Sequence, residues 1–438
     1  MTLTIPPLLA SRWFVVFLFI SFRLIVLFAH QPNLRSTNPP TYTVVEPDGI
    51  TATESGITAM GDYWYYFQLT RLSDLGYLPY RDYWYEFPPV FTTISLISYA
   101  LVTKDGTYSN YNPYANGVAL AILAFDTGSL LLIRRLGEKL HGKGTGILLG
   151  WLYAMLPISM IYGFWNFEPI VAFTILLSLN FFVSGRDVRG ALGIVLGAAT
   201  KVFPLVLLGA VWRFRERGEA LRVTAIAAIL TALVFGGVVA LNREYGLASL
   251  AVQFNKASYQ TVWALIDDNQ KTGLLDPDRR DPASAYRLQG NPAVIPWWGR
   301  GILLGGIGLA IFMRTRRRDE YGFVAFVAVT VIIFFLWSQG WSPQWLVTLT
   351  PLILLCFPNG TGVLFCVTLA FVTLAEFPLL FSFGKDSVTG RFSPETYPLW
   401  VALVLLRTFL LAALSYAIYK KLRVSVPRKA VGEGAASA

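Results

Sequence analysis

Residues 61–89 hold the side chains of this chain with the clearest capacity for chemistry. The stretch GDYWYYFQLTRLSDLGYLPYRDYWYEFPP combines carboxylates and arginines with closely spaced tyrosines and tryptophans. This mixture suits carbohydrate, because aromatic faces pack on pyranose rings and carboxylates bind or deprotonate hydroxyls. We therefore expect a saccharide site here, with Asp62 and Glu86 as its catalytic carboxylates. The plainer alternative is that these acids only keep an external loop hydrated.

Four further candidates lie later in the chain. Asn166 and Glu168 precede a proline at a predicted helix start, where helix capping alone would explain them. Lys201 lies at the predicted turn of an apolar hairpin, where an ammonium needs a partner or a route to water, and a phosphate would be a suitable partner. Gln344 belongs to the aromatic and amide-rich turn 339–345, which an interfacial aromatic belt explains equally well.

The composition predicts a membrane protein. The chain has 438 residues, of which 55% are hydrophobic and 14% charged, which is too apolar for a water-soluble domain of this length. The two cysteines lie inside apolar runs and exclude a disulfide framework or a cysteine-based metal site. With only two histidines, in different loops, we expect neither a histidine metal cluster nor a Ser/His/Asp triad.

Hydropathy and charge predict an all-α polytopic bundle in the lipid bilayer, with ten crossings and one re-entrant hairpin. Placing the loops rich in Lys and Arg inside puts both termini in the cytoplasm and leaves 31–89 and 242–294 as large external loops. Arginines flank both ends of 191–212, so this segment should go up and return near Lys201. The ten crossings are expected at residues 13–29, 115–133, 146–162, 168–184, 223–241, 295–313, 321–337, 343–357, 361–377 and 399–419.

Three other features complete this prediction. Segment 88–102 is expected to be re-entrant or to lie at the outer interface, and loop 242–294 to be either a lid or a partly ordered loop. One membrane domain should extend over residues 1–427, with 428–438 as a disordered cytoplasmic tail. The charge asymmetry of the loops accounts for the net charge of +10, so nucleic-acid binding is not needed to explain it.

Several motifs between residues 60 and 212 occur in a distinctive order. They are Asp-Tyr at 62–63, LGYLPYR at 75–81, YWYEFPP at 83–89, Asp126, NFE at 166–168 and KVFP at 201–204. Their order and spacing resemble the GPI-anchor first mannosyltransferase and the polyprenyl-phosphate-mannose-dependent mannosyltransferases of glycosyltransferase family 87. The C-terminal half matches only through SPQW at 342–345. Met60 occupies a position where the family usually has an acid, so a paired-carboxylate metal site is not expected there.

The resemblance implies the GT-C fold, a site on the outer face of the plasma membrane and a polyprenyl-phosphate sugar donor. We expect Asp62 to deprotonate an acceptor hydroxyl in an inverting transfer, and Lys201, with Arg71 or Arg81, to neutralise the leaving lipid phosphate. The remaining substrate-binding candidates are Asn166, Glu168, Tyr80, Trp84 and Gln344.

The hypothesis has specified partners and rivals. Mannose is the first choice of sugar and a glycolipid or glycan is the expected acceptor. No cofactor is required, although a divalent metal is compatible with the scheme. The alternatives are a secondary transporter or lipid flippase, suggested by Asp126 and the hairpin, and a non-catalytic subunit with the same fold.

Overall fold

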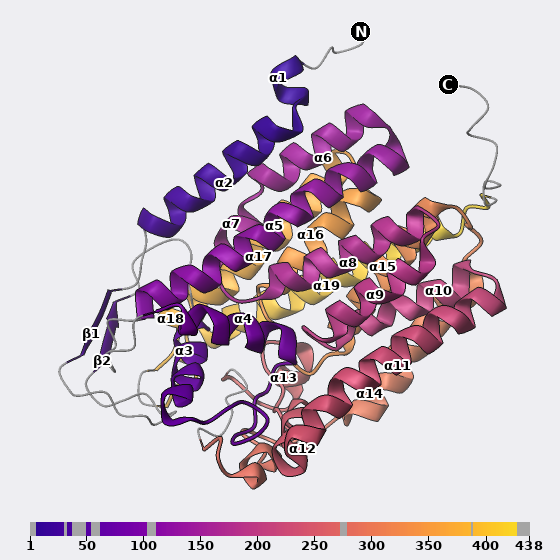
Figure 1. The fold of residues 1–438 in the computed structure, drawn as a ribbon. Coiled ribbons are helices and arrows are strands. Elements are labelled where there is room, and N and C mark those ends of the chain that lie inside the picture. The colour runs from indigo at the N-terminus through magenta and orange to yellow at the C-terminus, as the bar shows by residue number, and fades with distance from the viewer. Residues whose placement is uncertain are drawn as a thin grey trace.

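The computed structural model describes residues 6–29, 33–36, 50–53, 62–102, 111–271, 278–386 and 389–426. This part of the chain is predominantly helical (Figure 1). The described exceptions are two short antiparallel strands, β1 (Asn33–Ser36) and β2 (Ile50–Thr53). The helical, multi-span architecture expected from the sequence is therefore confirmed. The predicted disordered tail at 428–438 lies outside the described residues.

Each of the ten segments expected to cross the membrane is helical. Six helices of the described chain are long and apolar enough to cross a bilayer, as expected for an integral, multi-pass membrane protein. The expected crossings correspond to α2 (Arg12–Ala29), α5 (Tyr111–His141), α6 (Lys143–Met155) with α7 (Pro157–Tyr162), α8 (Glu168–Val183), α11 (Arg217–Leu241), α14 (Trp297–Arg314), α15 (Glu320–Trp337), α16 (Trp345–Cys356), α17 (Gly360–Leu374) and α19 (Tyr397–Leu422).

The hairpin predicted at residues 191–212 is present in the structure. It consists of α9 (Asp187–Ala198), the 3₁₀ turn η3 (Phe203–Leu207) and α10 (Leu208–Phe214). Arg215, just after α10, returns to the start of α9, where its Nε lies 2.8 Å from Asp187 Oδ2. Gly197 allows close packing on α8, because a Cβ there would lie 2.9 Å from Thr174 Oγ1.

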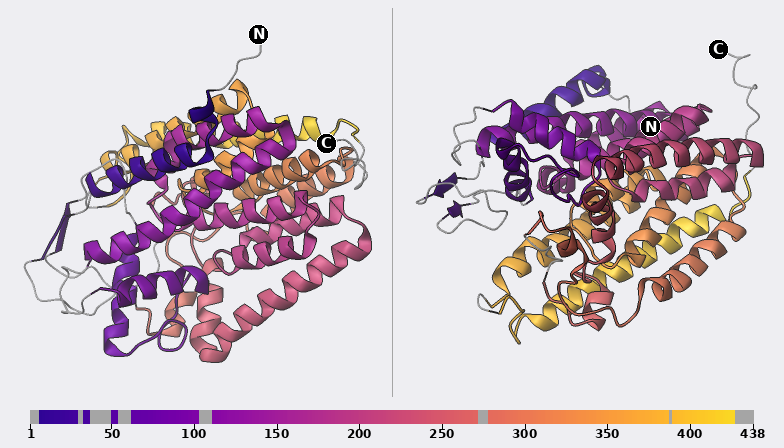
Figure 2. Two further views of the ribbon diagram at one scale, coloured as in Figure 1. Left: turned by 45° about the horizontal axis from the view of Figure 1, so that its top comes forward. Right: turned by 60° about the horizontal axis from the view of Figure 1, so that its bottom comes forward.

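The bundle has two different ends. The loop end holds α3 (Tyr63–Arg71), α4 (Pro89–Ala100), α12 (Arg243–Ala251) and α13 (Val262–Ile266), while α1 (Pro7–Ala10), α10 and the end of α19 lie at the opposite end (Figures 1 and 2). The hairpin turn belongs to the loop end, because Val90 N–H donates to the Ala199 carbonyl at 3.0 Å.

Helix α4 corresponds to the segment expected to be re-entrant or interfacial. Its 12 residues extend about 18 Å, which is shorter than the roughly 30 Å hydrocarbon core of a bilayer. The helix packs against α3 and α5.

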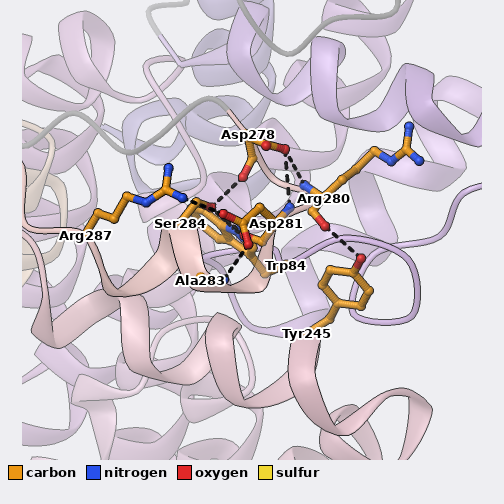
Figure 3. A network of polar contacts seen from close by, with 8 residues as sticks. All are labelled: Trp84, Tyr245, Asp278, Arg280, Asp281, Ala283, Ser284 and Arg287. Atoms are coloured by element: carbon orange, nitrogen blue, oxygen red, sulfur yellow. Dashed lines mark hydrogen bonds and ion pairs between the residues drawn. The ribbon is translucent and has the colours of Figure 1, made fainter.

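The described part of loop 242–294 is folded against residues 83–86. Trp84 is buried, and its Nε1 donates to Ser284 Oγ at 2.8 Å and to the Asp281 carbonyl at 3.2 Å. Figure 3 shows Trp84 among these residues, with Asp278 close by. The remaining short elements at the loop end are η1 (Leu72–Leu75), η4 (Val252–Phe254), η5 (Pro282–Tyr286), the π-helical turn η6 (Ala375–Leu380) and α18 (Phe381–Phe383).

Candidate active site

Asp62 lies immediately before α3 in a largely enclosed polar position. Its Oδ2 accepts hydrogen bonds from Tyr66 OH and Asn166 Nδ2, each at 3.3 Å. Burial raises the pKa of Asp62 to about 6, with a further increase from nearby Glu86, while the hydrogen bond from Asn166 opposes the shift. A carboxylate with this pKa is ionised at neutral pH and is still basic enough to take up a proton, as a general base must.

One chain of contacts joins Asp62 to Lys201. Asn166, which donates to Asp62, accepts the backbone N–H of Glu168 on its Oδ1 at 2.8 Å. Glu168 is the first residue of α8, and its Oε2 lies 2.9 Å from Lys201 Nζ. Its other oxygen accepts from Thr348 Oγ1 at 2.7 Å. The structure thus brings four of the sequence-predicted site residues together at the loop end.

Aromatic rings surround Lys201. Its ammonium lies 4.9 Å from the ring centre of Trp345 and 5.7 Å from that of Phe203. Gln344 precedes Trp345 and is buried, and its Oε1 has no hydrogen-bond partner in the described part of the chain. Gln344, a predicted binding residue, is therefore the chain neighbour of the tryptophan that packs against Lys201, and its Oε1 can accept a hydrogen bond from a ligand.

Glu86 lies between two cations that the sequence analysis missed. Lys256 Nζ lies 3.7 Å and Arg279 Nη2 3.6 Å from its carboxylate, and Tyr65 OH donates to it at 3.2 Å. Both cations come from loop 242–294, where the sequence analysis noted no cationic candidates. The only available signal was their positive charge in an external loop, since their approach to Glu86 depends on how that loop folds.

The structure separates the two predicted arginines from this chain of contacts. The Arg81 side chain is 48% exposed. Its guanidinium forms an ion pair with Asp82 at 2.7 Å and donates a hydrogen bond to the Gly76 carbonyl at 2.9 Å. Arg71 is buried at the far end of α3, about 13 Å along the helix axis from its start, and donates to Gln68 at 3.2 Å.

Tyr80 and Trp84 hold the loop in shape. Tyr80 OH donates to the Phe87 carbonyl at 2.5 Å and lies 2.7 Å from Thr92 Oγ1. The Arg279 guanidinium lies 3.7 Å from the ring centre of Trp84. Both side chains are buried by protein contacts, so the geometry accounts for them as supports of the segment that carries Glu86.

Asp126 is held by side-chain contacts inside the helical bundle. Its Oδ2 pairs with Arg23 Nε at 3.1 Å and its Oδ1 accepts from Tyr153 OH at 2.5 Å. Arg23 also donates to Ser159 at 2.6 Å. These contacts tie α2, α5, α6 and α7 together.

In the described chain, no three His, Cys, Asp or Glu residues gather in a way that could hold a metal ion.

Comparisons with known proteins find similarity only among solved structures. No protein-family model and no curated protein sequence matches this chain. The chain is similar to apo ArnT from Cupriavidus metallidurans, with 14% identity, a TM-score of 0.49 and coverage of 93% of this chain and 75% of ArnT. The chain is similarly related to ArnT bound to undecaprenyl phosphate, with 13% identity, a TM-score of 0.47 and coverage of 94% of this chain and 76% of ArnT.

The chain is also similar to the apo oligosaccharyltransferase of Archaeoglobus fulgidus, with 12% identity and a TM-score of 0.40. The match covers 95% of this chain and 56% of the oligosaccharyltransferase chain, so this chain spans little more than half the length of that protein. At these levels of similarity, none of these proteins assigns an activity to this chain. Fold and site together define a helical membrane protein with a partly buried acid, lysine and amide site at one end.

Proposed function

We propose that this protein is a membrane glycosyltransferase of the GT-C class that transfers a sugar from a polyprenyl-phosphate donor to a glycolipid or glycan acceptor. The observation that carries the proposal is the continuous link from Asp62 through Asn166 and Glu168 to Lys201. It unites a carboxylate suited to proton abstraction with an ammonium suited to phosphate. The motif resemblance favours mannose as the sugar.

The proposed reaction is an inverting substitution. The acceptor hydroxyl gives its proton to the Asp62 carboxylate while its oxygen forms a bond to the anomeric carbon of the donor sugar. The bond from that carbon to the phosphate oxygen breaks, and polyprenyl phosphate leaves with both bonding electrons. Lys201 stabilises the charge that develops on this phosphate, and Asn166 and Gln344 bind sugar hydroxyls. Glu86 orients the substrate from the Lys256 and Arg279 side.

The proposed location follows from charge. The basic loops belong in the cytoplasm together with both termini, so the loop end faces the exterior of the plasma membrane. A donor delivered within the bilayer suits a site at that face, where nucleotide sugars are not supplied. The scheme requires no cofactor, and a divalent metal remains compatible with it.

The test is Asp62→Asn in membranes supplied with radiolabelled polyprenyl-phosphate sugars. We expect loss of transfer while the protein still inserts, and full activity in this variant would reject Asp62 as the base. Arg81→Ala serves as a control from the same loop. Supplying mannose, glucose and arabinose donors separately identifies the sugar, with mannose expected.

The rival functions have no comparable support from the geometry. Asp126, which suggested a transporter, is engaged by Arg23 and Tyr153. Incorporation of labelled sugar by the purified protein separates the enzyme from a flippase and from a non-catalytic subunit, since neither of the latter forms a new glycosidic bond.

A further inference from the structure

A second polar site lies among the loops of the loop end. It is a cavity of about 360 Å³, within the range of small-molecule pockets. None of its lining residues belongs to the candidate active site described above. They are Ala257, Ser258, Asp268, Asn269, Gln270, Lys271, Gln289, Gly290, Asn291 and Arg391.

A single backbone segment separates this cavity from the candidate active site. Lys256 directs its ammonium to Glu86 at 3.7 Å, and the next two residues, Ala257 and Ser258, line the cavity. Tyr259 then pairs with residues 339–341, since its N–H donates to the Gln339 carbonyl at 3.1 Å and its carbonyl accepts from N–H of residue 341 at 3.0 Å. The same turn leads along the chain to Gln344, so short backbone segments connect the cavity wall to residues on both sides of the site.

Internal hydrogen bonds preorganise the cavity wall. Asn269 donates to Ser258 Oγ at 3.0 Å and accepts the Asn291 N–H at 2.8 Å. Asp268 adopts a left-handed backbone conformation with φ of 55°, which is uncommon for a residue other than glycine, and Arg391 holds its carboxylate at 2.6 and 2.8 Å. A strained residue fixed by its neighbours is typical of ligand sites.

Cations outnumber carboxylates here. Lys271 and Arg391 line the cavity, and Lys385 lies behind it with its Nζ donating to the Gln270 carbonyl at 2.6 Å. The one lining carboxylate, Asp268, is engaged by Arg391. Among the described residues no carboxylate lies within ion-pair distance of either lysine. Burial and the neighbouring Lys271 lower the pKa of Lys385 to about 7, so an anion placed here would relieve their repulsion.

We propose that this cavity binds the acceptor, and that the acceptor is an anionic saccharide bearing a phosphate or a carboxylate. Its hydroxyls would meet the amide groups and Asp268, and its anionic group would meet Lys271. That the bound saccharide is the acceptor rests on the proposed function. That the cavity binds an anionic saccharide rests on the cavity alone. Amides and a carboxylate satisfy hydroxyls, and an exposed lysine supplies a charge-assisted contact for the anion.

The direct test measures binding of small probes to the purified full-length chain in detergent without donor. The probes are mannose 6-phosphate, glucuronate, methyl mannoside and inorganic phosphate. The readout is saturation-transfer NMR for the three sugars, and inorganic phosphate is measured by its competition with them. We expect both charged sugars to bind more tightly than methyl mannoside and inorganic phosphate. The preferred charged sugar then identifies the anionic group as phosphate or carboxylate.

The variant Lys271→Ala should lower affinity for the charged sugars about tenfold and leave methyl mannoside unchanged. Lys271 is exposed and makes no side-chain hydrogen bond to the described residues, so this change should not affect folding. Arg243→Ala removes an exposed cation of α12 at the same end of the bundle and should have no effect. Equal binding of neutral and charged sugars, no binding of any sugar to the folded protein, or equal losses in both variants would overturn the proposal.

A donor-turnover assay separates failure of this inference from failure of the proposed function. Slow release of free sugar from a labelled polyprenyl-phosphate donor in water requires Asp62 and Lys201 but not the cavity. Normal donor turnover without probe binding would overturn only the cavity assignment. Probe binding that depends on Lys271, in a protein that turns over no lipid-phosphate donor, would overturn the proposed function and retain the saccharide site.

Discussion

Lys201 and Glu168 form an ion pair of 2.9 Å in which the Glu168 side chain is fully buried and the Lys201 side chain is 26% exposed. The two partners are therefore not equivalent. Glu168 is also held by Thr348 and its own helix N-terminus, whereas Lys201 has a path to a ligand. A phosphate approaching from the exposed side would share the lysine with Glu168. This arrangement holds the ammonium in place before the donor binds.

Lys201→Met should damage both stability and donor use. It leaves Glu168 buried without its counter-charge, a change that costs about 3–5 kcal/mol in comparable buried pairs. Adding Glu168→Gln should restore most of the stability, because no uncompensated charge remains. It should not restore donor affinity. Thermal unfolding in detergent and the KM for the lipid-phosphate donor measure the two effects, and a double variant with normal KM would argue against a phosphate contact.

The pH dependence of transfer should follow Asp62. Its pKa of about 6 predicts that kcat/KM rises with pH through about 6 and levels off above 7, because the base acts only when ionised. Initial rates between pH 5 and 8, with saturating donor and with acceptor well below its KM, give this profile. If residual activity of Asp62→Asn retains the same acid limb, another group is responsible for it.

Asp62→Asn should be at least as stable as the parent protein at neutral pH. The folded pKa of about 6 exceeds the ordinary value of 3.8, so the contribution of this group to stability is present below pH 3.8 and is lost as pH rises through 6. Asparagine removes the buried charge and can still accept from Tyr66 and Asn166. The melting temperature of Asp62→Asn should exceed that of the parent protein at pH 7.5 but not at pH 4.5. A large loss at pH 7.5 would mean that the carboxylate has a structural role.

Arg81→Ala should leave donor KM unchanged. Its guanidinium is half exposed and engaged by Asp82, and exposed pairs contribute about 0–1 kcal/mol. The comparison with Lys201→Met is informative because both remove one cation from the loop end. A rise in KM comparable to that of the Lys201 variant would show that Arg81 reaches the phosphate in the donor complex.

Trp84→Ala should loosen loop 242–294 from residues 83–86. The change removes the hydrogen bond to Ser284 and the ring under Arg279, and truncation of a buried tryptophan typically costs about 3–5 kcal/mol. Limited proteolysis should show faster cleavage within 242–294, with Ser284→Ala giving a smaller effect. Unchanged cleavage would mean that other contacts suffice to dock the loop.

The sequence by itself determined the helices, the hairpin and two of the reactive groups. Long apolar runs can satisfy their backbone in a bilayer only as helices, and arginines on both sides of 191–212 required that segment to return. Asp62 and Lys201 were recognisable because charged side chains beside apolar segments are costly without a purpose. These are local properties, and they can be read from neighbours along the chain.

Only the tertiary structure decided which groups meet. Glu86 pairs with Lys256 and Arg279, which are far away in the sequence, and Arg81 turns to its neighbour Asp82. The elevated pKa of Asp62 and the cavity beside Lys271 likewise arise from segments that fold together. Burial and ion pairing depend on distances of a few ångströms between segments, and residue spacing along a chain does not specify those distances.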